Sequence, residues 1–78
     1  MKTTRYFDSL KSRSDRANIK IEWISRVMLT PEKQITQEDG RIRKWAKIKE
    51  MENRYLRVVL LEDGITVHNA FFDRGFKL

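Results

Sequence analysis

The sequence predicts an α+β domain in which two N-terminal helices pack on a four-stranded antiparallel meander sheet. Three observations carry this prediction. Apolar residues recur at helical spacing before Pro31, and an Asp-Gly pair interrupts each of two later β-prone segments, at Asp39-Gly40 and Asp63-Gly64. An Asp-Gly pair between such segments favours a hairpin, because a type I′ turn needs φ > 0 at both central residues. With 78 residues, the chain is expected to form a single domain, residues 1–78.

The first helix is expected over residues 4–13 and the second over residues 20–29. Thr3 and Thr4 are suitable N-cap residues for the first helix. Pro31 disfavours the α region at Thr30 and therefore ends the second. The apolar stripes of the two helices are Tyr6, Phe7 and Leu10, and then Ile21, Ile24, Val27 and Met28 with Trp23 beside them.

The strands are expected on either side of the two Asp-Gly pairs. Val58–Leu61 is the longest apolar run and therefore predicts a central strand buried on both faces. Two-residue loops would fix the register of both hairpins, and the simplest register for the middle pair places Trp45 opposite Arg57. The other expected pairs are Leu60 with Val67, Val59 with His68, Leu56 with Phe71, Arg43 with Thr36, and Trp45 with Gln34.

This register divides the sheet into two faces, because directly opposed residues share a face. One face is the predicted core, which both helices should cover: Ile42, Ala46, Ile48, Leu56, Val58, Leu60, Ile65, Val67 and Phe71. The second face mixes basic, aromatic and smaller residues with the one histidine: Arg43, Trp45, Lys47, Tyr55, Arg57, Val59, Leu61, Thr66, His68, Ala70 and Phe72.

The composition is basic, with a formal net charge of +6 and a pI near 10.0. Part of the excess is local, since no acidic residue interrupts the basic run within Arg41–Lys49. Such a surface favours polyanions through phosphate contacts, although a basic surface without any nucleic-acid role fits the composition equally well. The absence of cysteine excludes disulfides and thiolate chemistry and fits a cytoplasmic location.

Several function classes receive no support from the sequence. No apolar run approaches the length of a membrane span or of a signal peptide, so no membrane association is expected. The carboxylates are scattered among basic residues, which argues against a metal site. The three glycines form no phosphate-cradling loop, and no cofactor is expected.

The second face suits single-stranded RNA, because basic side chains meet phosphates while aromatic rings stack on unpaired bases. Trp45, Lys47, Tyr55 and Phe72 are the expected residues for binding RNA or a protein partner. The alternative is a solvated sheet face on which long basic side chains cover aromatic surface.

His68 is the candidate general acid or base for phosphodiester cleavage, because the usual pKa of histidine suits that role. Arg57 and Arg43 would then stabilise the extra negative charge of the transition state. The alternative is a histidine that is hydrogen-bonded across the sheet and chemically inert.

The order of elements, together with Ile24–Pro31 and the strand Leu56-Arg-Val-Val59, resembles a family of small uncharacterised bacterial domains related to BrnT- and RelE-type toxins. The resemblance implies a curved sheet that binds RNA, metal-independent mRNA cleavage by a few Arg, Lys, Tyr or His residues, and a small acidic antitoxin that covers that surface. The chain departs from the family at Tyr6-Phe7-Asp8, where related domains often have His-Ala, and its last strand is more apolar.

Three hypotheses follow. The first is a non-enzymatic domain that binds RNA or a protein partner through the second face. The alternative is a toxin-type endoribonuclease that uses His68, Arg57 and Arg43. The third is a subunit of an assembly, such as a homodimer, that buries Phe71 and Phe72.

Overall fold

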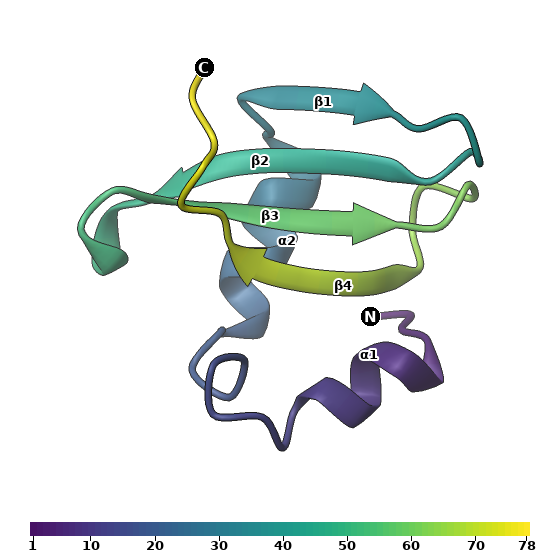
Figure 1. Cartoon of the computed structure of the whole chain (residues 1–78), viewed down its shortest axis with the longest axis horizontal. Helices are drawn as coiled ribbons and strands as arrows, with labels where there is room; N and C mark the ends of the chain where they lie inside the picture. Colours follow the sequence, from purple (N-terminus) through teal and green to yellow (C-terminus); the bar gives the residue numbers. More distant parts are fainter.

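Four antiparallel strands form one sheet in the meander order β1-β2-β3-β4, as expected from the sequence (Figure 1). The computed structural model describes residues 1–78 and has an α+β fold. Its elements are α1 (Arg5–Leu10), α2 (Ile21–Leu29), β1 (Lys33–Thr36), β2 (Ile42–Ile48), a short 3-10 helix (Lys49–Met51), β3 (Arg54–Leu60) and β4 (Val67–Phe72). Neither α-helix has the length and hydrophobicity needed to cross a membrane.

Helix α2 covers one face of the sheet and supplies Trp23, Ile24 and Val27 to the core (Figure 1). The sheet contributes the other fully or nearly buried members of this core: Ala46, Ile48, Leu56, Val58, Leu60, Val67 and Ala70. The predicted core face is therefore confirmed along β2 and β3, whereas Ile65 is exposed in the last turn.

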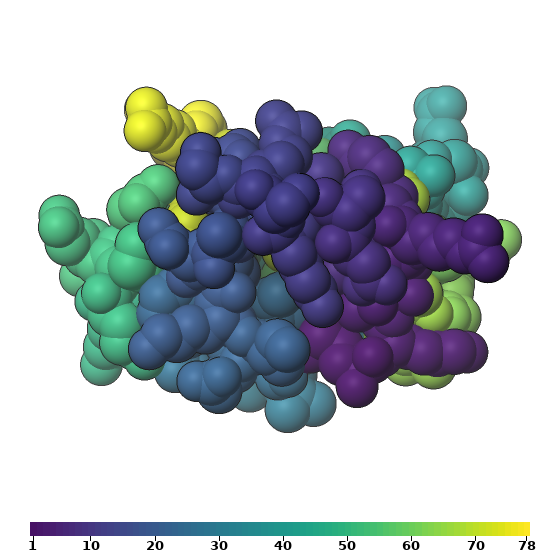
Figure 2. Space-filling model, turned by 90° about the horizontal axis from the view of Figure 1, so that it is seen from below, coloured from purple at the N-terminus to yellow at the C-terminus, as the bar shows by residue number.

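Helix α1 lies beside β4 at the edge of the sheet (Figure 1), whereas the sequence predicted that both helices cover the core face. Figure 2 shows the N-terminal part of the chain, in purple, beside the blue part that contains α2. The side chain of Thr4 caps this helix by accepting the backbone N–H of Phe7 at 3.0 Å. The preceding backbone pairs with β4, since Val67 donates to the carbonyl of Lys2 and accepts from Thr4. These bonds satisfy part of the free edge of β4, which explains why α1 is placed there.

The β2–β3 register agrees with the prediction, because Trp45 lies opposite Arg57 and Lys47 opposite Tyr55. The predicted β1–β2 register is wrong by one residue. Gly40 adopts a φ of +90° in a turn that Gln37 and Arg41 close with a backbone bond, so the loop has three residues and not two. Ile35, and not Thr36, therefore lies opposite Arg43.

The predicted β3–β4 register is correct at Leu60 and Val67 and wrong by one residue beyond them. A bulge places the additional residue, His68, between Val67 and Asn69, so that Val59 lies opposite Asn69 and not His68. The remaining pairs are Val58 with Ala70, Arg57 with Phe71, and Leu56 with Phe72.

The bulge exchanges the faces of the two phenylalanines. Phe71 was expected in the core, but it shares a face with Arg57 on the side away from α2. Phe72 was expected on that second face, but it packs against the core and lies 6.1 Å from the ring of Trp23. The same shift places Ala70 in the core.

Candidate functional site: a basic-aromatic sheet face

The sheet face opposite α2 carries side chains from β2, β3 and β4. We call it the basic-aromatic face, and its central residues are Arg43, Trp45, Lys47, Tyr55, Arg57 and Phe71. No helix covers this face, although the C-terminal segment crosses part of it (Figure 1). Alternation along the strands explains the grouping, because opposed residues of neighbouring strands point to the same side.

Arg57 lies at the centre of this face between two aromatic rings. Its guanidinium carbon is 5.1 Å from the ring centroid of Phe71 and 5.6 Å from that of Trp45. The guanidinium of Arg16 lies 5.1 Å from the same Phe71 ring. Cations and aromatic rings therefore alternate across the strands, and each such contact orients a guanidinium through the quadrupole of the ring.

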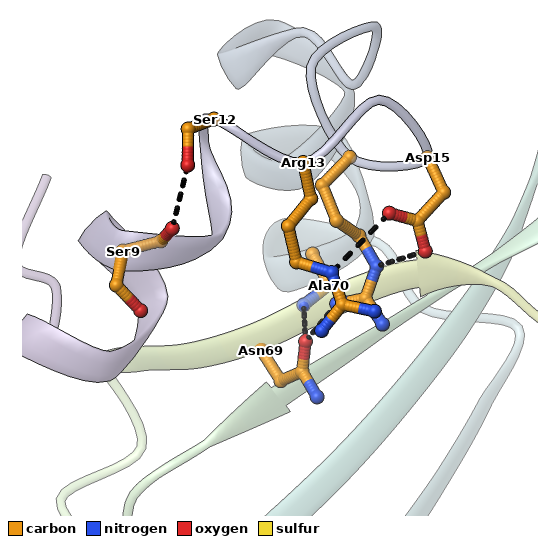
Figure 3. A network of polar contacts seen from close by, with 7 residues as sticks. Ser9, Ser12, Arg13, Asp15, Asn69 and Ala70 are labelled. Atoms are coloured by element: carbon orange, nitrogen blue, oxygen red, sulfur yellow. Dashed lines mark hydrogen bonds and ion pairs between the residues drawn. The ribbon is translucent and has the colours of Figure 1, made fainter.

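Arg16 contacts Phe71 and Asn69 of β4 from the loop after α1. Its polar partners Asp15 and Asn69 are labelled in Figure 3. Its Nη1 donates to Oδ1 of Asn69 at 2.7 Å, and its Nε forms an ion pair with Asp15 at 3.5 Å. Asp15 also pairs with Arg13. Local sequence patterns did not predict this contribution, because Arg16 is distant in the chain from β4, the strand that it meets.

Arg43 and Arg57 lie close enough on this face for their like charges to interact. The pKa of Arg57 is lowered from its usual value by partial burial and by the positive charge of Arg43, while Asp73 opposes this shift. The guanidinium of Arg57 stays charged in spite of this shift, since arginine does not lose its proton in proteins. The Nε atoms of Arg43 and Arg57 are buried and have no hydrogen-bond partner.

The sequence suggested that Trp45 is available on the surface, but in the structure it is buried. Only 4% of its area is exposed, because Phe76 stacks on it with the ring centroids 4.7 Å apart and the planes 14° from parallel. Its indole Nε1 donates to Oδ2 of Asp73 at 3.0 Å. Tyr55 is half-buried beside the same Phe76 ring, at 4.9 Å.

The other expected binding residues have different environments. Lys47 is exposed, and its Nζ lies 5.9 Å from the ring of Tyr55. Phe72 lies on the α2 side of the sheet, where the guanidinium of Arg54 is 4.5 Å from its ring. The structure therefore brings Lys47, Tyr55 and Arg57 onto one face and separates Phe72 from them.

His68 lies at the margin of the basic-aromatic face, at the β4 bulge. Its Nδ1 is 3.0 Å from the hydroxyl of Thr4, and its ring lies 5.0 Å from the ring of Tyr6. The pKa of His68 is lowered, first by partial burial and second by the charge of Arg41. Both effects favour the neutral imidazole.

His68 and Arg57 line the same shallow depression of about 350 Å³, together with Arg41 and Phe71. Arg43 does not line this depression. Of the predicted catalytic set, the structure thus brings two members to one concavity and places the third farther along the sheet. Arg41 is the cation that sequence reasoning missed, although it belongs to the predicted basic run.

No group of three or more His, Cys, Asp or Glu side chains gathers at a position suited to a metal ion. Comparisons of the chain with protein-family models, curated proteins and solved structures find no match.

Proposed function

We propose that this chain is a small RNA-binding domain that engages single strands through the phosphate-binding cations of its basic-aromatic face. The observation that carries the proposal is the pair Arg43 and Arg57, which lie diagonally across β2 and β3 on a sheet face that no helix covers. Both side chains are half-buried, and a phosphate oxygen is a strong acceptor for the NH2 groups of a guanidinium.

The surroundings of this pair suit a strand of phosphates. Arg41 and Lys47 are exposed at either end of β2, and Lys33 lies beside Trp45 on β1. A flat sheet face with cations spread along neighbouring strands fits an extended backbone better than a deep groove would. Single-stranded RNA is favoured over a duplex because the half-buried ring of Tyr55 also suits an unpaired base.

A protein partner is the less favoured ligand for this face. Protein interfaces usually depend on exposed aromatic or aliphatic residues near their centre. The large apolar side chain that this face exposes is Ile35, which is 43% exposed. It lies on the outer strand β1 and not at the centre of the face. The central rings of Trp45 and Phe71 are already packed inside the chain.

Fluorescence anisotropy with a short labelled oligouridine tests the proposal. We expect binding at low salt that weakens as salt rises, because each phosphate contact releases counterions. Arg43→Gln and Arg57→Gln should each weaken binding and reduce the slope of log K against log salt by about 0.7. Arg26→Gln is the matched control, since it removes the same charge from α2 on the opposite side of the sheet.

The absence of any binding at low salt would contradict the proposal. Equal losses for Arg26→Gln and for Arg43→Gln would also contradict it, because the interaction would then depend on net charge and not on this face.

Metal-independent RNA cleavage is a second candidate, favoured by the depression that His68 and Arg57 share. Arg57 would hold the phosphate while His68 transfers a proton. Incubation of a labelled RNA with the protein in the presence of a chelator should then yield fragments, and His68→Ala should abolish them. Intact RNA with well-folded, RNA-bound protein would reject cleavage while leaving the binding proposal in place.

A further inference from the structure

The segment Asp73–Phe76 crosses the basic-aromatic face directly after β4 (Figure 1). The backbone N–H of Asp73 donates to the carbonyl of Tyr55 at 2.9 Å, which extends the strand pairing by one bond. Beyond that point the segment leaves the sheet edge, and its side chains rest on the face that the proposed function assigns to RNA.

The contacts of this segment have the chemistry of a nucleotide. Phe76 presents a flat ring that stacks on Trp45 at 4.7 Å and touches Tyr55 at 4.9 Å. The Asp73 carboxylate accepts from Nε1 of Trp45 at 3.0 Å and lies 3.7 Å from Nη1 of Arg57. An aromatic ring and an anion are also what one nucleotide presents through its base and its phosphate.

We propose that the segment Asp73–Phe76 occupies a nucleotide subsite of the RNA-binding face, with Phe76 in the place of a base and the Asp73 carboxylate in the place of a phosphate. The inference rests on the proposed function and deepens it, because it assigns Trp45 and Tyr55 to the base and Arg57 to the phosphate. RNA that fills this subsite must displace the segment.

The segment is held in a way that permits exchange. After Asp73, the residues Arg74, Gly75 and Lys77 are exposed, and the ring of Phe76 is the main anchor. The backbone bonds beyond Asp73 are local, from Gly75 to the Asp73 side chain and from Phe76 to the Asp73 carbonyl. No strand or helix needs to break for the Phe76 ring to leave Trp45.

When RNA replaces the segment, the donors that Asp73 now satisfies keep a hydrogen-bond acceptor. The indole N–H of Trp45 and the guanidinium of Arg57 need an acceptor when Asp73 moves away, and a phosphate supplies one. The base replaces the Phe76 ring against Trp45, so the apolar surface of the indole stays covered. The segment therefore lowers RNA affinity by competition and does not block the outer cations Arg41 and Lys47.

Oligouridine binding by the whole chain and by tail variants tests this inference. Phe76→Ala should tighten binding by at least about fivefold, since a base then stacks on Trp45 without competition. Phe76→Tyr keeps a ring of similar shape and should bind as the unaltered chain does. Leu78→Ala is the matched control within the tail, because Leu78 is 71% exposed.

Asp73→Asn should also tighten binding, because it removes the carboxylate that competes with phosphate at Arg57. Glu22→Gln is its control, since it changes the net charge equally from an exposed position on α2. Circular dichroism of each variant checks that the fold is kept. Acrylamide quenching of tryptophan fluorescence should rise in Phe76→Ala and fall again when oligouridine is added.

A sugar–phosphate oligomer without bases distinguishes the base position at Trp45 from the phosphate position at Arg57. It should bind Phe76→Ala no more tightly than the unaltered chain, whereas oligouridine should distinguish the two proteins. Equal oligouridine affinity of the unaltered chain and folded Phe76→Ala would overturn the subsite and leave the proposed function standing. Failure of every variant to bind RNA at low salt would overturn both.

Discussion

The Nδ1 atom of His68 lies 3.0 Å from the hydroxyl of Thr4, which is the N-cap residue of α1. The Thr4 oxygen already accepts the backbone N–H of Phe7, so its own proton is free to point at Nδ1. Nδ1 accepts this proton in the neutral tautomer that carries the imidazole proton on Nε2. The histidine thereby connects β4 with the start of α1, and this contact is made by the neutral ring.

We expect the stability of the fold to decrease between pH 7 and pH 5.5 in a way that depends on His68. Its pKa is lowered from 6.5 by burial and by Arg41, and Arg57 lines the same depression. The unfolded chain therefore takes up a proton at a higher pH than the folded chain, and acid favours unfolding as the pH falls through 6.5. Thermal unfolding midpoints of the unaltered chain and of His68→Gln measure this effect.

The variant should have a flatter profile across this pH range. The carboxylates with resolved shifts, Glu50 and Asp63, have pKa values of about 2 and do not titrate there. Parallel profiles for the two proteins would show that His68 keeps its ordinary pKa in the fold.

Asp63 should stabilise the β3–β4 turn only while it is ionised. Its carboxylate accepts the hydroxyl of Thr66 and the backbone N–H groups of Ile65 and Thr66, and these bonds lower its pKa from 3.8 to about 2. A lowered carboxyl pKa contributes stability above pH 3.8 that is lost as the pH falls toward 2. Asp63→Asn should therefore lower the unfolding midpoint at pH 7.

The difference between the unaltered chain and Asp63→Asn should shrink as the pH falls from 4 toward 2. The exposed neighbour Glu62 provides the control, since Glu62→Gln should leave the midpoint at pH 7 nearly unchanged. A constant difference at every pH would mean that the hydrogen bonds, and not the charge, make the contribution of Asp63.

Gly40→Ala should destabilise the fold by about 1–2 kcal/mol, because Gly40 has a φ of +90° and an L side chain is strained there. The added Cβ would also lie 2.8 Å from Oε2 and 3.2 Å from Cβ of Glu62. Urea unfolding followed by tryptophan fluorescence measures the change. Gly75→Ala is the control, since its Cβ would meet its nearest neighbour at 3.8 Å; a similar loss in both variants would argue against the left-handed turn.

Local sequence patterns were sufficient to locate the helices and strands, although α1 ends at Leu10 and not at residue 13. Helical spacing before Pro31 located α2 to within a residue, and Thr4 was a recognisable cap for α1. The β2–β3 register followed from the simplest pairing, because a shifted pairing would have turned Ile48 and Leu56 out of the core. The basic residues of β2 and β3 were accordingly placed on the correct face.

The β1–β2 register error arose at the turn, whereas the β3–β4 error arose at the bulge at His68. An Asp-Gly pair fits a two-residue type I′ loop, but Gly40 closes a three-residue loop and Asp63 organises a longer turn around its own carboxylate. The bulge at His68 then exchanged the faces of Phe71 and Phe72. Phe71 and Phe72 are both apolar, so either could face the core. The hydrophobic pattern therefore does not reveal the bulge.

The sequence by itself determined the meander, the face covered by α2 and the cations of β2 and β3, because these depend on periodicity and on neighbouring strands. Only the tertiary structure decided what surrounds those cations. Arg16, Asp73 and Phe76 reach the face through long-range contacts. Such contacts follow from the paths of a loop and a C-terminal segment, and no local pattern of apolar and polar residues encodes those paths.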